Sequence, residues 1–298
     1  MTLYHTAASV EEALAILAEH GGEARVIAGG TDVMVDMRKG KIAPRCLVDI
    51  THIPELRQIS VEGEVVRVGA AVPFAEIHQH PFIARRVHVL ADAARSVGAL
   101  PIQSAATWAG NIVQAMPAAD GAIAAVALGA EARVADASGD EWKPVEALFL
   151  GPGVSAVDPT RQIITHIRFR VPPRLWGSAW SRAGRRESLV LPTLNCGVGL
   201  RLDEDGTLAD VAIALGPVAP RPYRARDAEA FLRGKPPDAV AFAQAACIIT
   251  GDCNPRTSPA RATREYRLAL ILVMVVRTLE LATERARHVT DEPVEPNS

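Results

Sequence analysis

The stretch Ile27-Ala28-Gly29-Gly30-Thr31-Asp32 stands between two segments with different patterns. The apolar run 24–28 is typical of a buried strand, and residues 33–39 predict a short helix. Two adjacent glycines allow a tight turn and a close approach of a ligand to the backbone. Thr31 and Asp32 are residue types that cap a helix, and free N–H groups at a helix start suit a phosphate. A short Gly-rich turn also occurs where nothing binds, so this stretch alone leaves both interpretations open.

The residues on either side of this loop predict a small α/β unit. Ser9 and Glu12 form a capping box ahead of an apolar helical pattern that ends near residue 21. Residues 46–50 form a second short apolar run, which we expect to pair in parallel with the strand before the glycine loop. This order of strand, helix and strand predicts a subdomain that ends near residue 59.

A second small, nearly uncharged stretch is Thr107-Trp108-Ala109-Gly110-Asn111. Asp120 follows it, just before a helix of small residues predicted over 122–130. A lone acid at that place can cap the helix. It can equally accept a hydrogen bond from a ligand hydroxyl, as acids do with ribose in dinucleotide sites. The sequence leaves both roles for Asp120 open.

Composition narrows the class of protein. The chain has 298 residues, of which 49% are hydrophobic and 4% aromatic, and its net charge is −2. These values are typical of a globular protein and do not favour a nucleic-acid partner. None of the four cysteines stands in a C-x-x-C pair, so we expect free thiols, a reducing compartment and no protein-bound metal. The N-terminus has no secretory pattern, and the longest apolar run, 268–276, is too short to span a bilayer. We therefore expect a cytoplasmic protein.

The motifs together occur in the order and approximate spacing of one family. Ala28–Asp32, Thr107–Asn111 and Pro117–Asp120 resemble the FAD-binding medium subunit of the molybdenum hydroxylases, the family of xanthine dehydrogenase and aerobic carbon monoxide dehydrogenase. The resemblance implies that both loops hold the FAD pyrophosphate and that Asp120 binds the adenosine end. The implied FAD-binding residues in these motifs are Ile27, Ala28, Gly29, Gly30, Thr31, Asp32, Thr107, Ala109, Gly110, Asn111 and Asp120. Trp108 and Ala109 replace the family's usual Ile and first Gly.

The resemblance continues to about residue 285. The hairpin predicted over 195–215 and the loop 216–222 after it are similar to family segments. Segment 180–187 resembles a strand that carries a Lys near the flavin edge, and Arg182 occupies the Lys position. Arg182 is therefore an implied flavin contact, with a solvated charge cluster as the alternative interpretation.

The resemblance also implies the fold. We expect an α+β protein with a two-part FAD-binding domain of the vanillyl-alcohol-oxidase/PCMH type over 1–173, divided into subdomains of about 1–59 and 60–173. Pro172-Pro173 marks the predicted boundary. A C-terminal domain of the CO dehydrogenase flavoprotein type, with a small antiparallel sheet and helices, follows over 174–290.

The implied function is electron transfer within a heteromeric complex. A small partner subunit would carry [2Fe–2S] clusters, a large partner subunit would carry the molybdopterin cofactor, and this chain would pass electrons through FAD to an acceptor. No catalytic residue is assigned here, since the flavin ring carries the chemistry. Two alternatives are a self-sufficient FAD-dependent oxidase and a ligand-binding protein with a decayed flavin site. The substrate and the acceptor, whether NAD⁺, a quinone, oxygen or a carrier protein, are not determined by this sequence.

Overall fold

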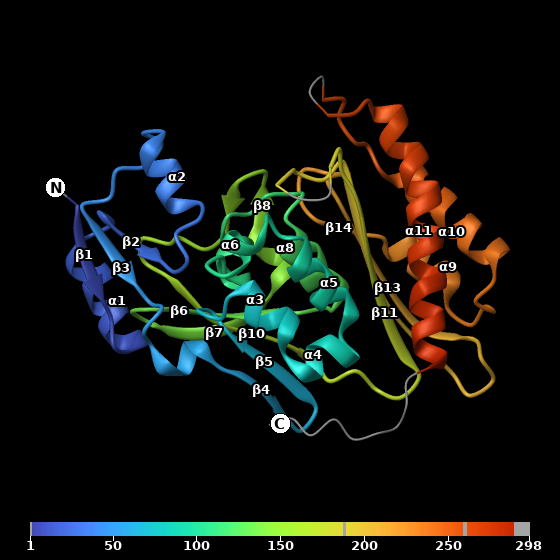
Figure 1. The fold of residues 1–298 in the computed structure, drawn as a ribbon, viewed down its shortest axis with the longest axis horizontal. Helices are drawn as coiled ribbons and strands as arrows, with labels where there is room; N and C mark the ends of the chain where they lie inside the picture. The colour runs from blue at the N-terminus through green and yellow to red at the C-terminus, as the bar shows by residue number, and fades with distance from the viewer. Residues whose placement is uncertain (1, 187–188, 259–260, 289–298) are drawn as a thin grey trace.

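The computed structural model describes residues 2–186, 189–258 and 261–288. Its parts follow one another along the longest axis (Figure 1): a small N-terminal unit, a central unit, and a C-terminal sheet covered by long helices. The structure thus has the mixed helix and sheet architecture expected from the resemblance, and that prediction is confirmed.

The N-terminal unit is a three-stranded parallel sheet in the order β1-β3-β2. Its strands are β1 (Leu3–Thr6), β2 (Ala24–Ile27) and β3 (Cys46–Asp49), and its helices are α1 (Val10–Glu19), α2 (Val33–Arg38) and the 3-10 turn η1 (Pro54–Arg57). The capping box is present, because Ser9 Oγ accepts from the N–H of Glu12 at 3.1 Å and the Glu12 carboxylate accepts from the N–H of Ala8 at 2.7 Å. Strand β1 was not predicted, because its four residues are all exposed and carry no burial signal.

The central unit is built on a five-stranded antiparallel sheet in the order β4-β5-β10-β6-β7. Its strands are β4 (Ile59–Glu62), β5 (Val65–Gly69), β6 (Glu131–Asp136), β7 (Gly139–Pro144) and β10 (Ile163–Arg170). The remaining elements of this unit are α3 (Phe74–Gln79), α4 (Pro81–Arg86), α5 (His88–Ser96), α6 (Leu100–Gln103), α7 (Trp108–Val113), α8 (Asp120–Ala127), η2 (Val145–Leu148), β8 (Phe149–Gly151) and β9 (Val154–Ser155). Helix α7 begins within the second predicted loop, directly after Thr107, and α8 begins at Asp120.

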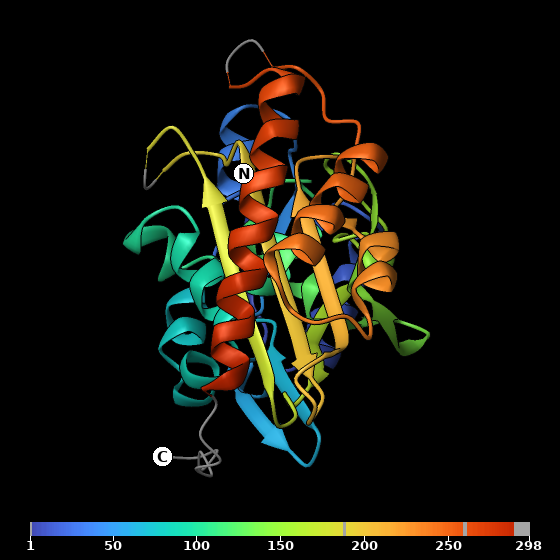
Figure 2. The same ribbon diagram turned by 90° about the vertical axis from the view of Figure 1, so that its right-hand side faces the viewer.

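The C-terminal unit is a four-stranded antiparallel sheet in the order β11-β12-β13-β14. Its elements are β11 (Trp176–Ala183), β12 (Leu194–Leu202), β13 (Leu208–Gly216), β14 (Tyr223–Arg224), α9 (Arg226–Leu232), α10 (Ala239–Asp252) and α11 (Arg264–Arg287). The long helices α10 and α11 cover one face of this sheet (Figure 2). The hairpin predicted over 195–215 is formed by β12 and β13.

The other face of the C-terminal sheet packs on the central unit. A Cβ on Gly197 of β12 would lie 3.0 Å from Val89 and 3.3 Å from Ala127, so a glycine lets the sheet approach α5 and α8 closely. Trp180 of β11 is buried with the central core, and its indole N–H donates to Ser96 Oγ at 3.2 Å. The C-terminal unit is thereby held against the helices that border the predicted site. None of the helices in the described part of the chain is long and apolar enough to cross a membrane.

Candidate functional site

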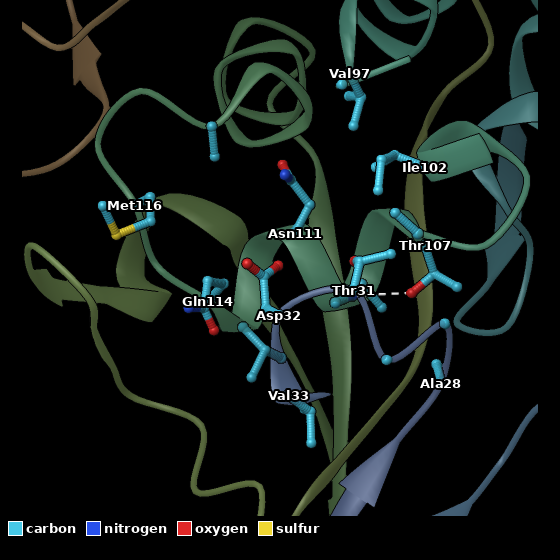
Figure 3. Close-up of a pocket in the computed structure, with 18 of the residues that line it drawn as sticks. Ala28, Thr31, Asp32, Val33, Val97, Ile102, Thr107, Asn111, Gln114 and Met116 are labelled. Carbon is cyan, nitrogen blue, oxygen red and sulfur yellow. Dashed lines mark hydrogen bonds between the residues drawn. The ribbon is translucent and has the colours of Figure 1, made fainter. Parts of the chain in front are cut away.

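A cavity of about 460 Å³ lies where the three units meet (Figure 3). Its volume falls within the usual range for small-molecule sites. Both predicted loops line it, over 28–33 and at Thr107 and Ala109–Asn111. The other lining residues are Arg25, Val26, Ile50, Ala70, Val97, Gly98, Ile102, Ala106, Val113, Gln114, Met116, Ala118, Ala119, Asp120, Val157, Pro159, Gln162–Ile164, Arg182 and Leu189–Pro192. Two loops separated by about eighty residues in the sequence therefore form one wall.

The first glycine loop is held against the second by Gly29. A Cβ on Gly29 would lie only 1.7 Å from the carbonyl oxygen of Ala105, which is in the segment leading into the second loop. Gly29 is therefore required for the contact between the two loops, rather than for the approach of a ligand. Gly30 has φ +68°, a conformation that residues other than glycine rarely adopt. Ile27 is buried beneath this turn and does not line the cavity.

The start of α2 supplies backbone donors to this wall. In the part of the chain that the structure describes, the N–H groups of Gly30, Thr31 and Asp32 donate to no protein oxygen. Asp32 stands at the N-cap position, yet neither its side chain nor that of Thr31 caps the helix, so that prediction is wrong. Asp32 is exposed, yet desolvation by the neighbouring atoms, followed by the charge of Asp36, raises the pKa of its carboxylate. Its side chain points toward Asn111 across the cavity (Figure 3).

The second loop forms a capped helix start. Thr107 is the N-cap of α7, and its Oγ1 accepts from the N–H of Gly110 at 3.1 Å. The N–H of Ala109 has no acceptor within the described residues, and Ala109 itself lines the cavity. A Cβ on Gly110 would meet only Thr107 Oγ1, at 3.1 Å. Asn111 accepts from the N–H of Ala122 at 3.2 Å, so it connects α7 to α8.

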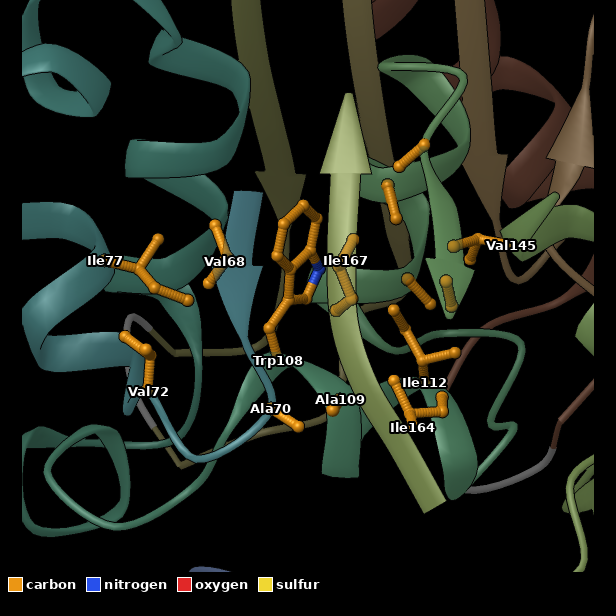
Figure 4. Close-up of a cluster of buried hydrophobic side chains, with 14 of the residues drawn as sticks. Val68, Ala70, Val72, Ile77, Trp108, Ala109, Ile112, Val145, Ile164 and Ile167 are labelled. Carbon is orange, nitrogen blue, oxygen red and sulfur yellow. The ribbon is translucent and has the colours of Figure 1, made fainter. Parts of the chain in front are cut away.

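Trp108 points away from the cavity into the central core (Figure 4). It is fully buried, packs edge-on against Phe169, and donates from its indole N–H to the carbonyl of Gly121 at 2.8 Å. The unusual residue of the second loop is therefore a core residue. Its neighbour Ala109 adds one methyl group at the cavity wall, where it also contacts the core.

Asp120 lines the cavity and lies in a buried polar cluster. Its carboxylate is 3.5 Å from the guanidinium of Arg182 and accepts from Asn195 Nδ2 at 2.9 Å. Burial raises the pKa of Asp120 to about 6, although the hydrogen bond from Asn195 and the charge of Arg182 both lower it. Asp120 is the first residue of α8, and its side chain makes no capping hydrogen bond, so the capping role is wrong.

The same cluster brings together two residues that the resemblance assigned to different parts of FAD. Asp120 was assigned to the adenosine end and Arg182 to the flavin edge, and the structure places their side chains 3.5 Å apart. Sequence reasoning also missed Asn195, Arg25 and the segment 189–192. Only Arg25 carried a signal, as a charged residue in the apolar strand before the glycine loop.

The comparison with known families settles the family. The family described as the FAD binding domain in molybdopterin dehydrogenase matches residues 1–173. The chain belongs to this family. Residues 179–282 match the CO dehydrogenase flavoprotein C-terminal domain. The predicted family and the predicted FAD cofactor are thereby confirmed.

Relatives of the flavoprotein cover nearly its whole length. It is 29% identical over 287 residues to the putative xanthine dehydrogenase FAD-binding subunit XdhB of Escherichia coli K12, which covers 95% of this chain and 96% of that protein. It is 29% identical over 283 residues to the carbon monoxide dehydrogenase medium chain of Hydrogenophaga pseudoflava, with 95% and 97% covered.

Solved structures agree with this grouping. Carbon monoxide dehydrogenase from Hydrogenophaga pseudoflava has a chain that superimposes with a TM-score of 0.89 at 30% identity, covering 95% of this chain and 98% of that one. Quinoline 2-oxidoreductase from Pseudomonas putida 86 gives a TM-score of 0.87 at 26% identity, covering 97% and 99%. The predicted oxidoreductase class, that of a molybdenum hydroxylase flavoprotein, is confirmed by these matches.

Proposed function

We propose that this chain holds FAD in the cavity between its three units and transfers electrons through it within a heteromeric molybdenum hydroxylase. The observation that carries the proposal is that two loops with free N–H groups, from separate subdomains, form one wall of a single cavity. Backbone N–H groups arranged in this way suit the two phosphates of a dinucleotide. The division into an FAD-binding domain over 1–173 and a C-terminal domain over 174–290 is part of the proposal, with 289–290 outside the described residues.

The residues present fit the cofactor. Gly30 supplies the positive φ of +68° that the turn requires, and a Cβ on Gly110 would meet only Thr107 Oγ1. The N–H groups of Gly30, Thr31, Asp32 and Ala109 would hold the pyrophosphate. When bound, FAD would supply a ring that takes up electrons one at a time from an iron–sulfur cluster and passes them on singly or as a pair, which this chain's own side chains cannot do.

The other residues of the site orient the cofactor and leave one side accessible. Val97, Ile102 and Leu189 supply an apolar surface beside the Asp120–Arg182 pair. Leu189 and Leu191 are 56% and 48% exposed, so the cavity reaches the surface there. An electron donor or acceptor would approach a bound ring at this exposed edge of the cavity, beside Leu189 and Leu191. Segment 180–187 belongs to the same proposed docking region, and Glu187 lies outside the described residues.

The partners are proposed from the relatives. The similar proteins are named as FAD-binding subunits or medium chains of dehydrogenases, which supports a small iron–sulfur subunit and a large molybdopterin subunit beside this chain. Within the described residues, no group of three His, Cys, Asp or Glu side chains could hold a metal ion. The free cysteines support a place in the cytoplasm. The electron acceptor and the substrate of the complex are not assigned.

The oxidase alternative receives no support from the site. Covalent flavin attachment often uses a His or a Cys, and the described residues that line the cavity include neither. We therefore expect non-covalent FAD. The test is to purify the full chain alone, precipitate it with acid, and measure flavin, iron and molybdenum. We expect FAD in the supernatant and dye reduction from an artificial donor. Flavin retained in the pellet, or oxidation of an organic substrate without partners, would favour the oxidase.

A further inference from the structure

Arg25 is a cavity residue that no motif accounts for. It lies on β2, lines the cavity and is half-buried. Its Nε is buried and has no hydrogen-bond partner. Within the described residues, its guanidinium forms neither a hydrogen bond nor an ion pair. A buried donor without an acceptor is costly, so its persistence at a cavity wall calls for an acceptor that the protein itself does not provide.

The charges near Arg25 do not supply that acceptor. Burial lowers the pKa of Arg25, while the carboxylates of Asp36 and Asp158 raise it from a distance. Asp36 forms an ion pair with Lys41 at 3.0 Å, and Asp158 accepts from Thr160 Oγ1 at 2.7 Å. Both carboxylates are therefore engaged elsewhere. The guanidinium remains available to a ligand.

The position of Arg25 relative to the glycine loops indicates which part of the ligand it meets. Val97 and Ile102 lie on one side of the loops, and β2 leads away from Ala28 on the other (Figure 3). Beside Arg25 the cavity is lined by Pro159 and Gln162, and β2 is joined to this segment by the hydrogen bond from Val26 N–H to the Pro159 carbonyl at 2.9 Å. The two loops therefore lie between an apolar arm of the cavity, lined by Val97 and Ile102, and a polar arm of the cavity, lined by Arg25 and Gln162.

FAD has the same layout, with a pyrophosphate between an apolar isoalloxazine and a polar adenosine. We propose that Arg25 binds the adenosine-monophosphate half of FAD and so makes this site select FAD over FMN. The inference rests on the proposed function. A guanidinium suits this half because it donates to phosphate oxygens in a planar fork and stacks on aromatic rings. FMN ends at the first phosphate and has nothing to place in the polar arm.

The test is titration of the full-length apoprotein with FAD and, separately, with FMN, comparing the parent with Arg25→Gln. Arg45→Gln is the matched control, because Arg45 lies directly before β3, the strand that pairs with β2, and its side chain is 75% exposed and pairs with Glu23 at 3.2 Å outside the cavity. We expect Arg25→Gln to raise the Kd for FAD about tenfold or more, as for a lost charged hydrogen bond. The Kd for FMN should stay within about twofold, as should both Kd values of Arg45→Gln.

A second measurement separates ligand binding from folding. The apoprotein of Arg25→Gln should unfold at the same temperature as the parent or at a higher one, because no protein partner is lost. If Arg25→Gln lowered the stability of the apoprotein and weakened the binding of FAD and of FMN equally, Arg25 would be a structural residue and the inference would be overturned. A parent that binds FAD, with Arg25→Gln binding it equally well, would overturn the inference alone. A parent that binds no flavin would overturn the proposed function as well.

Discussion

Gly29→Ala tests the contact that joins the two loops. The added Cβ would lie 1.7 Å from the Ala105 carbonyl oxygen and 2.3 Å from its carbon, both backbone atoms. Because neither atom belongs to a flexible side chain, the two loops would have to move apart by more than about 1 Å to restore van der Waals separation. Overpacking of this kind costs about 1–3 kcal/mol of folding free energy.

The same movement should weaken FAD binding. Hydrogen bonds lengthened by about 1 Å are largely lost, and the pyrophosphate would be held by one loop rather than by two. We therefore expect the Kd for FAD to rise at least about tenfold, equivalent to about 1.4 kcal/mol.

The assay is denaturant unfolding of the apoprotein together with FAD titration. Gly251→Ala is the matched control, because a Cβ on Gly251 in α10 meets nothing within 4 Å. That substitution should leave FAD affinity unchanged and raise stability by up to about 1 kcal/mol, the helix preference for Ala over Gly. A Gly29→Ala protein with the stability and FAD affinity of the parent would refute the loop contact.

Three further predictions follow from the site. Gly110→Val should weaken FAD binding more than tenfold (roughly 1.4 kcal/mol or more). The unfolding temperature of the apoprotein should change little, since a Cβ at this position meets only Thr107 Oγ1. A variant that purifies with the same flavin content as the parent would contradict this prediction. The pKa of Asp120 is raised to about 6, so the folded apoprotein holds this proton more tightly than the unfolded chain and its stability should fall as pH rises from about 4 to 6. Asp120→Asn should lack this loss, so the difference in unfolding free energy between parent and variant across this pH range measures the contribution of Asp120. Trp108→Phe should cost about 1–3 kcal/mol in denaturant unfolding, because the Gly121 carbonyl loses its donor, while unchanged FAD affinity would confirm that Trp108 lies outside the site.

The two loops could be predicted because their signals are local. A glycine pair after an apolar run, and a Thr before small residues, specify a turn and a helix start through the conformations that those residues allow. The roles of individual residues were harder to predict. Gly29 meets a carbonyl of another loop rather than a ligand, and Trp108 fills the core rather than the site. Nothing in a local pattern distinguishes those surroundings.

The sequence by itself determined the positions of both loops, the hairpin of the C-terminal unit and the resemblance that identified the cofactor. These depend on residue type and short spacing, which the chain carries without folding. Only the tertiary structure decided that Asp120 meets Arg182, that Asn195 donates to Asp120 from the C-terminal unit, and that the buried Nε of Arg25 has no acceptor among the described residues. Contacts between such distant positions depend on how the sheets pack against α5 and α8, and close packing of whole units leaves no trace in any short stretch of sequence.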